Sequence, residues 1–314
     1  MIPGKRGVDV FGRSAVLLAA LGAAMVVGVT GGSASVRMSA PLPALSSLVL
    51  SPADFRSGAT GAVQGSATVG GMPAFVRVFR SGVRIGAAPL LGAVSLAVLE
   101  PDASTAVYDF TSLNLSTQTK AGRLALAKAW AIDFAKGASK TKLVVKQTVV
   151  GAPVEVGASA FRLPVTIKTN LGTVRLSLEV AQTDRVLAIV MLMGRLNGRL
   201  DASDAAHALA AAQQHLQAAF TVANTTAPTI SGTQTQGQVV SVDEGNWTGA
   251  PSEFSYSWSR CDTSGANCAA IADATTSSYT VTAADAGSTL RVTVTGSNSV
   301  TSQAGVSSAT AVVS

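Results

Sequence analysis

Residues 161–193 read FRLPVTIKTNLGTVRLSLEVAQTDRVLAIVMLM, and this stretch decides the fold of the front part of the chain. Apolar and polar residues alternate along Phe161–Ile167 and along Val174–Val180, which is typical of strands with one buried face. The polar residues that this alternation places on the outward face include Arg162, Ser177 and Glu179. Val186–Met193 is apolar on both faces, which favours a central strand. Because short turns such as Thr169–Gly172 join these strands, they predict an antiparallel meander.

The segments around the meander predict two main helices and further strands. Apolar residues within Thr119–Gly137 recur at helical spacing, and Gly137 is a stop signal. An alanine-rich helix begins at Asp201 or Ser203 and ends near Phe220. Upstream, Phe75–Phe79 and Arg84–Leu99 are predicted strands. Strands and helices in this order, without βαβ alternation, predict an α+β domain with an antiparallel sheet over residues 40–222.

This organisation resembles a known family. Residues 45–54 read LSSLVLSPAD, and one mid-domain helix and the 161–193 meander follow. Together they resemble the exported domains of actinobacterial lipoproteins and kinase sensor modules with the Mog1/PsbP-like fold. The resemblance implies a binding or accessory module, and it transfers no residue role to this chain.

A second compositional regime begins at Pro228, after a polar linker predicted at residues 223–227. Thr, Ser and Gly now dominate, and turn signals separate short alternating runs at the spacing of a β-sandwich. The predicted strands are 229–231, 238–242, 253–261, 268–272, 278–282, 288–298 and 304–313. The sequence therefore predicts an all-β domain over residues 228–314.

This second domain resembles the immunoglobulin-like repeats of bacterial, especially actinobacterial, surface proteins. The residues that carry the resemblance are Pro228–Gly232, Gly245–Gly249, Tyr256–Cys261, Cys268–Ile271, Tyr279 and Asp285–Gly287. The resemblance implies an immunoglobulin-like sandwich.

Two features of this domain are candidate sites. Cys261 and Cys268 flank a six-residue loop, a spacing that suits a structural disulfide across a hairpin. A redox-active pair is the alternative, although it needs a depressed thiol pKa. Trp247 lies in a glycine-bounded loop, where its indole either contacts a sugar or protein partner or plugs the end of the sandwich.

Residues 1–35 predict an export signal. Lys5, Arg6 and Arg13 precede the apolar run Ser14–Val29, and small residues that suit cleavage follow at Gly31–Ser35. The apolar run is short for a spanning helix, so cleavage is favoured and an uncleaved anchor remains the alternative. The expected location is extracellular or in the cell envelope.

The charge of the chain is unevenly distributed. The net charge is +6, yet residues 36–227 hold 18 bases and 10 acids, whereas residues 228–314 hold two bases and six acids. A basic exported domain suits anionic wall polymers or lipid head groups, although such charges also serve simply to solvate a surface. Because no basic stripe with interleaved aromatic residues occurs, nucleic acid is not an expected partner.

Residues for catalysis are sparse. His207 and His215 are eight apart on one predicted helix, about 80° around its axis, which does not suit a shared metal. Ser139–Lys142 matches the Ser-x-x-Lys tetrapeptide of penicillin-binding proteins, but its partner motifs are missing. The sequence predicts no catalytic residue, no metal site and no cofactor.

The favoured function is that of a secreted or cell-envelope binding or accessory protein without enzymatic activity, whose immunoglobulin-like domain serves adhesion or display. Expected partners are a cell-wall polymer, a carbohydrate or another surface protein, with membrane contact only through an uncleaved signal anchor. In a second hypothesis, Ile85–Leu99 and Val186–Met193 line a cavity for a lipid or other apolar ligand. In a third, the chain is an exported serine hydrolase with His207 or His215 as its base.

Overall fold

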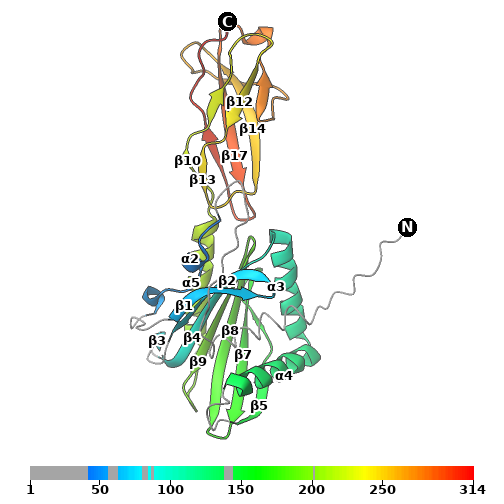
Figure 1. The fold of residues 1–314 in the computed structure, drawn as a ribbon, viewed down its shortest axis with the longest axis vertical. Helices are drawn as coiled ribbons and strands as arrows, with labels where there is room; N and C mark the ends of the chain where they lie inside the picture. Colours follow the sequence, from blue (N-terminus) through cyan, green and yellow to red (C-terminus); the bar gives the residue numbers. More distant parts are fainter. Residues whose placement is uncertain (1–41, 56–62, 80–83, 86–87, 138–143, 201) are drawn as a thin grey trace, which may run out of the picture. The chain divides into compact units, whose positions relative to one another are not determined.

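The computed structural model describes residues 42–55, 63–79, 84–85, 88–137, 144–200 and 202–314 (Figure 1). The predicted export signal lies outside these residues. Contacts between Cα atoms divide the chain into two compact units, Ala44–Leu216 and Gln217–Ser314. The described chain is mostly antiparallel β-sheet and has four helices.

The first unit is built on one nine-stranded sheet in which every strand pair is antiparallel. Seven strands follow one another across it in the order β1 (Val63–Val69), β2 (Met72–Phe79), β4 (Ala88–Leu99), β9 (Val186–Gly194), β8 (Thr173–Thr183), β7 (Ala160–Thr169) and β5 (Val145–Val150). Two short strands, β3 (Arg84–Ile85) and β6 (Val154–Glu155), pair with β4 and β7. The predicted meander is therefore confirmed as β7–β8–β9.

The helices of this unit are α2 (Leu45–Leu48), α3 (Ala103–Gln118), α4 (Lys120–Gly137) and α5 (Ala202–Phe220). The helices predicted from Thr119 and toward Phe220 correspond to α4 and α5. The prediction of two main helices is wrong, because α3 is a third long helix. Its sequence is rich in Ser and Thr, which favour turns. The helix nevertheless forms because the Asp102 carboxylate accepts from the Thr105 amide at its start and Phe110 is buried.

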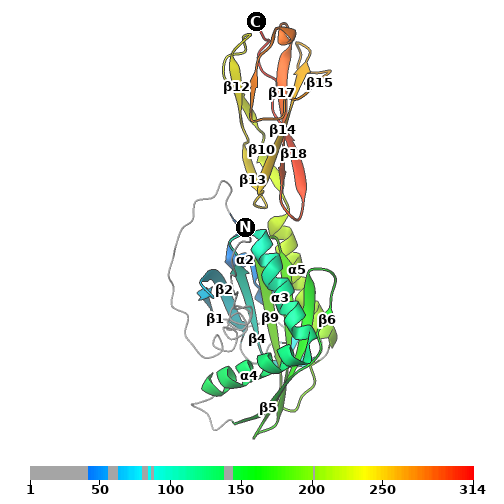
Figure 2. The same ribbon diagram turned by 90° about the vertical axis from the view of Figure 1, so that its right-hand side faces the viewer.

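Each face of the sheet has its own core. On one face, Phe110 and Leu113 of α3 and Leu126 of α4 pack against the sheet, and α4 runs beside β5 (Figure 2). On the other face, alanines 205, 208 and 212 of α5 pack with Leu50 and Phe55. β9 lies in the middle and serves both cores, because Ile189 and Met191 point to the first core and Val190 and Leu192 to the second. This arrangement confirms the prediction that Val186–Met193 forms a central strand.

The second unit consists of three small antiparallel sheets. Their orders are β10 (Ala223–Thr226)–β13 (Asn246–Thr248), β11 (Thr229–Ser231)–β12 (Val239–Asp243)–β16 (Ser278–Thr280), and β15 (Ala269–Ala270)–β14 (Glu253–Cys261)–β17 (Thr289–Ser297)–β18 (Ser302–Val306). Val240 of β12, Trp258 of β14 and Val292 of β17 meet in one buried core. Apolar residues of the three-stranded and the four-stranded sheet thus enclose a common interior.

Two strands of this unit, β10 and β13, were not predicted, and they pair with each other. β10 is formed by residues that were expected to belong to a linker at 223–227. Polar sequence suggested a linker, but β10 is an edge strand whose Asn224 amide is satisfied by the side chain of Gln303. The strand predicted at 304–313 ends earlier, at Val306, although Ser307, Thr310 and Val313 still bond to the backbone around β17.

Candidate functional site

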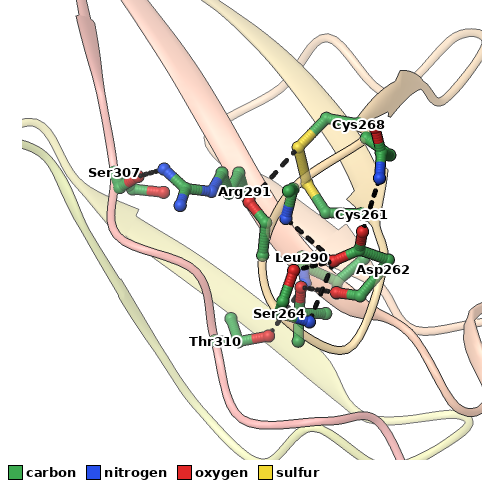
Figure 3. The surroundings of a disulfide bond; sticks show 12 residues. Cys261, Asp262, Ser264, Cys268, Leu290, Arg291, Ser307 and Thr310 are labelled. Carbon is green, nitrogen blue, oxygen red and sulfur yellow. Dashed lines mark hydrogen bonds between the residues drawn. A yellow bond between two sulfur atoms is a disulfide. The ribbon is translucent and has the colours of Figure 1, made fainter.

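The two cysteines of the chain form a disulfide (Figure 3). Cys261 ends β14 and Cys268 precedes β15, and their sulfur atoms are 1.97 Å apart. Between them, the carboxylate of Asp262 accepts hydrogen bonds from the amides of Ser264 and Ala266 and from the side chains of Ser264 and Asn267. These bonds, with the Ser264 hydroxyl foremost, lower the pKa of Asp262 to about 2. The carboxylate therefore shapes the loop from within.

Trp247 is a core residue of the second unit. It is only 6% exposed, its Nε1 donates to the Glu244 carbonyl at 2.8 Å, and its ring meets Phe254 edge to face at 5.6 Å. A buried indole with a satisfied N–H offers no free face for stacking. The candidate partner contact at Trp247 is therefore corrected, because the side chain belongs to the core of the second unit.

A buried carboxylate organises the end of β17 that lies near η2 (Ala283–Asp285). Asp285 is fully buried and lies 2.6 Å from Nη2 of Arg260. Its other oxygen accepts from the hydroxyls of Tyr279 and Thr282 and from the Thr282 amide. Burial by itself raises the pKa of Asp285, but these hydrogen bonds and Arg260 outweigh it, so the pKa lies below its usual value. The cluster fixes this corner of the unit and presents no reactive group.

The two histidines do not form a common site. His207 is exposed on α5, whereas His215 ties the segment after α2 to that helix. The Nε2 atom of His215 lies 3.3 Å from the Asp54 carboxylate and Nδ1 lies 3.2 Å from the Val49 carbonyl. Through these two contacts, His215 connects the segment containing Val49 and Asp54 to α5. Ser139–Lys142 and Asp201 lie outside the described residues.

Two polar residues of β8, Ser177 and Glu179, were predicted to lie on an outward face of the sheet. This prediction is wrong, because both side chains are buried. Glu179 pairs with Arg162 at 3.0 Å and accepts from the Ser177 hydroxyl at 2.5 Å. Burial raises the pKa of Glu179 to about 7, against the opposing effects of Ser177 and Arg162. The sequence contained a signal for this pair. Residues 162 and 179 are equidistant from the centre of the Thr169–Gly172 turn, so an antiparallel hairpin places them opposite each other.

Of the two apolar stretches proposed to line a ligand cavity, Val186–Met193 lies in β9. Most of Ile85–Leu99 lies in β4, Ile85 lies in β3, and residues 86–87 lie outside the described residues. Val186–Met193 is buried on every residue, and Ala93–Val98 of β4 is buried as well. Alternate residues of both strands enter the two cores. Small side chains there serve close packing of helices on the sheet.

In the first unit, several acidic side chains are buried, whereas many basic side chains are exposed. Its buried side chains include five acids, namely Glu100, Asp109, Glu179, Asp184 and Asp204. The exposed side chains include seven bases, namely Lys120, Lys128, Lys146, Lys168, Arg175, Arg195 and Arg199. The outer surface is consequently more basic than the composition of the unit indicates.

Among the residues that the structure describes, no three His, Cys, Asp or Glu side chains gather in a way that suits a metal ion. None of the helices in the same residues combines the length and apolar character needed to cross a bilayer.

No family model matches the chain, and no curated protein matches it. Among solved structures, the extracellular domain of PknH from Mycobacterium tuberculosis aligns with a TM-score of 0.33 and 11% identity, over 55% of this chain and 97% of that chain. A similarity of this size assigns neither a fold nor a function to the chain.

Proposed function

We infer that the chain is an exported, envelope-associated protein without enzymatic activity, in which the first unit is a binding or accessory module and the second an immunoglobulin-like display or adhesion module. The observation that carries this proposal is the disulfide between Cys261 and Cys268. Structural disulfides persist in oxidising compartments and are rare in the cytosol of mesophiles. A bonded cysteine pair that closes a short hairpin loop serves structure in this proposal.

The strand arrangement of the second unit supports the immunoglobulin-like assignment. The three-stranded and the four-stranded sheet enclose a core around Trp258, which lies on β14, the strand that pairs with β17. Asp285 and Arg260 clamp one end of this core. Modules of this kind serve as rigid spacers or binding surfaces on cell envelopes, and their polar outer faces suit that role.

Export is tested with the full chain produced in an actinobacterial host. The chain recovered from the envelope or the medium is treated with a thiol-alkylating reagent, with and without prior reduction, and then weighed by mass spectrometry. We expect two alkyl groups after reduction and none before it. The Cys261→Ser/Cys268→Ser variant is the control and takes up none in either case. A chain found in the cytosol with two free thiols would overturn the proposal.

The absence of enzymatic activity is tested separately with a fluorophosphonate probe, which labels activated serines. We expect no labelling of the native chain. Labelling that disappears in His215→Gln but persists in His207→Gln would instead establish a serine hydrolase and overturn the non-enzymatic assignment. The two histidines form a matched pair because they lie on the same helix.

A further inference from the structure

At one end of the sheet of the first unit, β7 and β9 end and β5 begins (Figure 1). Hydrogen bonds join the described residues next to these strand ends. The amide of Val144 donates to the Asn170 side chain at 2.8 Å, and the amide of Asn170 donates back to the Val144 carbonyl at 3.0 Å. Likewise, the Asn197 amide donates to the Thr173 carbonyl at 2.7 Å, and the Thr173 amide donates to the Asn197 side chain at 2.9 Å. These bonds hold Val144 and Asn197 against the two sides of the β7–β8 turn.

One aliphatic side chain next to each of these strand ends is exposed. Val144 precedes β5 and is 59% exposed, Leu171 lies in the β7–β8 turn and is 61% exposed, and Leu196 follows β9 and is 45% exposed. Single exposed aliphatic residues need no explanation, but three on hydrogen-bonded neighbouring loops form an apolar projection.

Basic residues lie in the same strands and loops as these three aliphatic residues. Five of the exposed bases of the unit belong to the same end of the sheet, namely Lys146, Lys168, Arg175, Arg195 and Arg199. Arg175 donates to the Gly198 carbonyl at 2.7 Å, which brings β8 against the loop after β9. Within the described residues, no ion pair joins any of the five to a carboxylate. We call the three aliphatic and five basic residues the sheet tip.

We propose that the sheet tip docks the first unit onto an anionic lipid bilayer, with its aliphatic side chains entering the interfacial region and its bases lying among the head groups. The two parts of the tip meet the two requirements of peripheral membrane binding, which are apolar area that leaves water and positive charge beside anionic lipid. Among the described residues, the five buried acids of the unit are not exposed beside the tip.

A lipid surface fits the tip better than a soluble polyanion. A hydrated anionic polymer satisfies the bases but gives Val144, Leu171 and Leu196 no apolar environment. The bilayer accounts for both the charge and the exposed aliphatic residues. The sequence led us to expect membrane contact only through an uncleaved signal anchor, and the sheet tip adds a second route that does not depend on that anchor.

The test measures sedimentation of the exported chain, as recovered from its host, with vesicles. One set is phosphatidylcholine alone and the other contains about 30 mol% phosphatidylglycerol, since anionic lipid supplies the attraction. We expect binding to the anionic vesicles and little to the neutral ones. Each Lys or Arg at a membrane surface changes affinity about fivefold, so Lys168→Gln/Arg195→Gln should weaken binding at least tenfold. Leu171→Ser/Leu196→Ser should weaken it by a similar factor.

Lys120→Gln/Lys128→Gln is the matched control, because it removes the same charge from exposed positions on α4. We expect it to retain most of the binding, and thermal unfolding establishes that all variants are folded. An equal loss of vesicle binding in this control would mean that binding depends only on the overall charge of the chain, and it would overturn the proposal. Failure of the native chain to bind anionic vesicles would overturn it as well.

A parallel assay with inorganic polyphosphate separates the two sources of negative charge. We expect the serine variant to bind vesicles at least tenfold more weakly while its affinity for polyphosphate stays unchanged. If it keeps full vesicle affinity, the aliphatic residues do not enter lipid, and the proposal is overturned. None of these outcomes bears on export or on the disulfide, so failure here leaves the proposed function standing.

Discussion

Glu179 on β8 lies directly opposite Arg162 on β7, and Nε of Arg162 donates to both of its carboxylate oxygens, at 3.0 and 3.2 Å. The pair lies on the face of the sheet that α5 covers, and Glu179 is fully buried there. Burial nevertheless dominates and raises the pKa of Glu179 to about 7, although Ser177 and Arg162 favour the charged form. The carboxyl therefore titrates near neutrality inside the protein.

This pKa predicts a stability that changes with pH. The folded state holds the Glu179 proton up to about pH 7, whereas the unfolded chain releases it near 4.5. Between these values the folded state binds more protons, so the free energy of unfolding rises as the pH falls. Relative to Glu179→Gln, the native chain should gain about 2 kcal/mol between pH 8 and pH 5. Urea unfolding at both values measures this difference, and parallel pH profiles would contradict it.

The Asp285 cluster predicts the opposite dependence. Removal of one partner of a buried ion pair leaves the other uncompensated, so Asp285→Ala should destabilise the second unit by about 3 kcal/mol. Because the pKa of Asp285 is lowered in the folded state, its contribution is present at neutral pH and is lost as the pH falls through that value. Chemical unfolding at pH 7 and at acidic pH measures both effects. Glu253→Gln, on an exposed residue of β14, should change stability little.

The sequence carried enough information for the strands of the meander and for most strands of the second unit. Alternation reports which residues of a strand share a face, and an unbroken apolar run such as Val186–Met193 reports burial on both faces. Alternation does not report whether the polar face is covered. Ser177 and Glu179 were therefore assigned to solvent although their face of the sheet is buried there.

Other features depended on tertiary contacts. α3 has a weak apolar pattern, and its burial against the sheet overrides the preference of its Ser and Thr residues for turns. The sheet tip joins residues 144, 171 and 196, which only the order of strands β9–β8–β7–β5 brings together. Cys261 and Cys268 were predictable because a disulfide across a short hairpin is a local feature.

The disulfide predicts a measurable loss of stability in its absence. Closing so short a loop restricts the unfolded chain by about 2.5 kcal/mol in the chain-entropy model. Cys261→Ser/Cys268→Ser should therefore unfold at lower denaturant concentration by that amount, with the loop hydrogen bonds to Asp262 still able to form. Dithiothreitol should reproduce the loss in the native chain and leave the variant unchanged. An effect of the reductant on the variant would contradict this account.

Gly122 offers a test in which helix propensity and packing predict opposite signs. In an exposed helix, Gly→Ala stabilises by about 1 kcal/mol. Here a Cβ at residue 122 would lie 1.8 Å from the Ser116 carbonyl oxygen and 3.0 Å from Oγ1 of Thr119, so the corner between α3 and α4 must open to admit it.

We therefore expect Gly122→Ala to destabilise the first unit by at least about 2 kcal/mol, since backbone atoms do not yield as flexible side chains do. Ala121→Gly, at the neighbouring exposed position, should cost only the propensity difference of about 1 kcal/mol. Thermal unfolding of the two variants and the native chain distinguishes the packing prediction from the helix-propensity prediction. A Gly122→Ala variant as stable as the native chain would mean that α3 and α4 do not approach each other at Ser116, because only that approach makes the methyl group unfavourable.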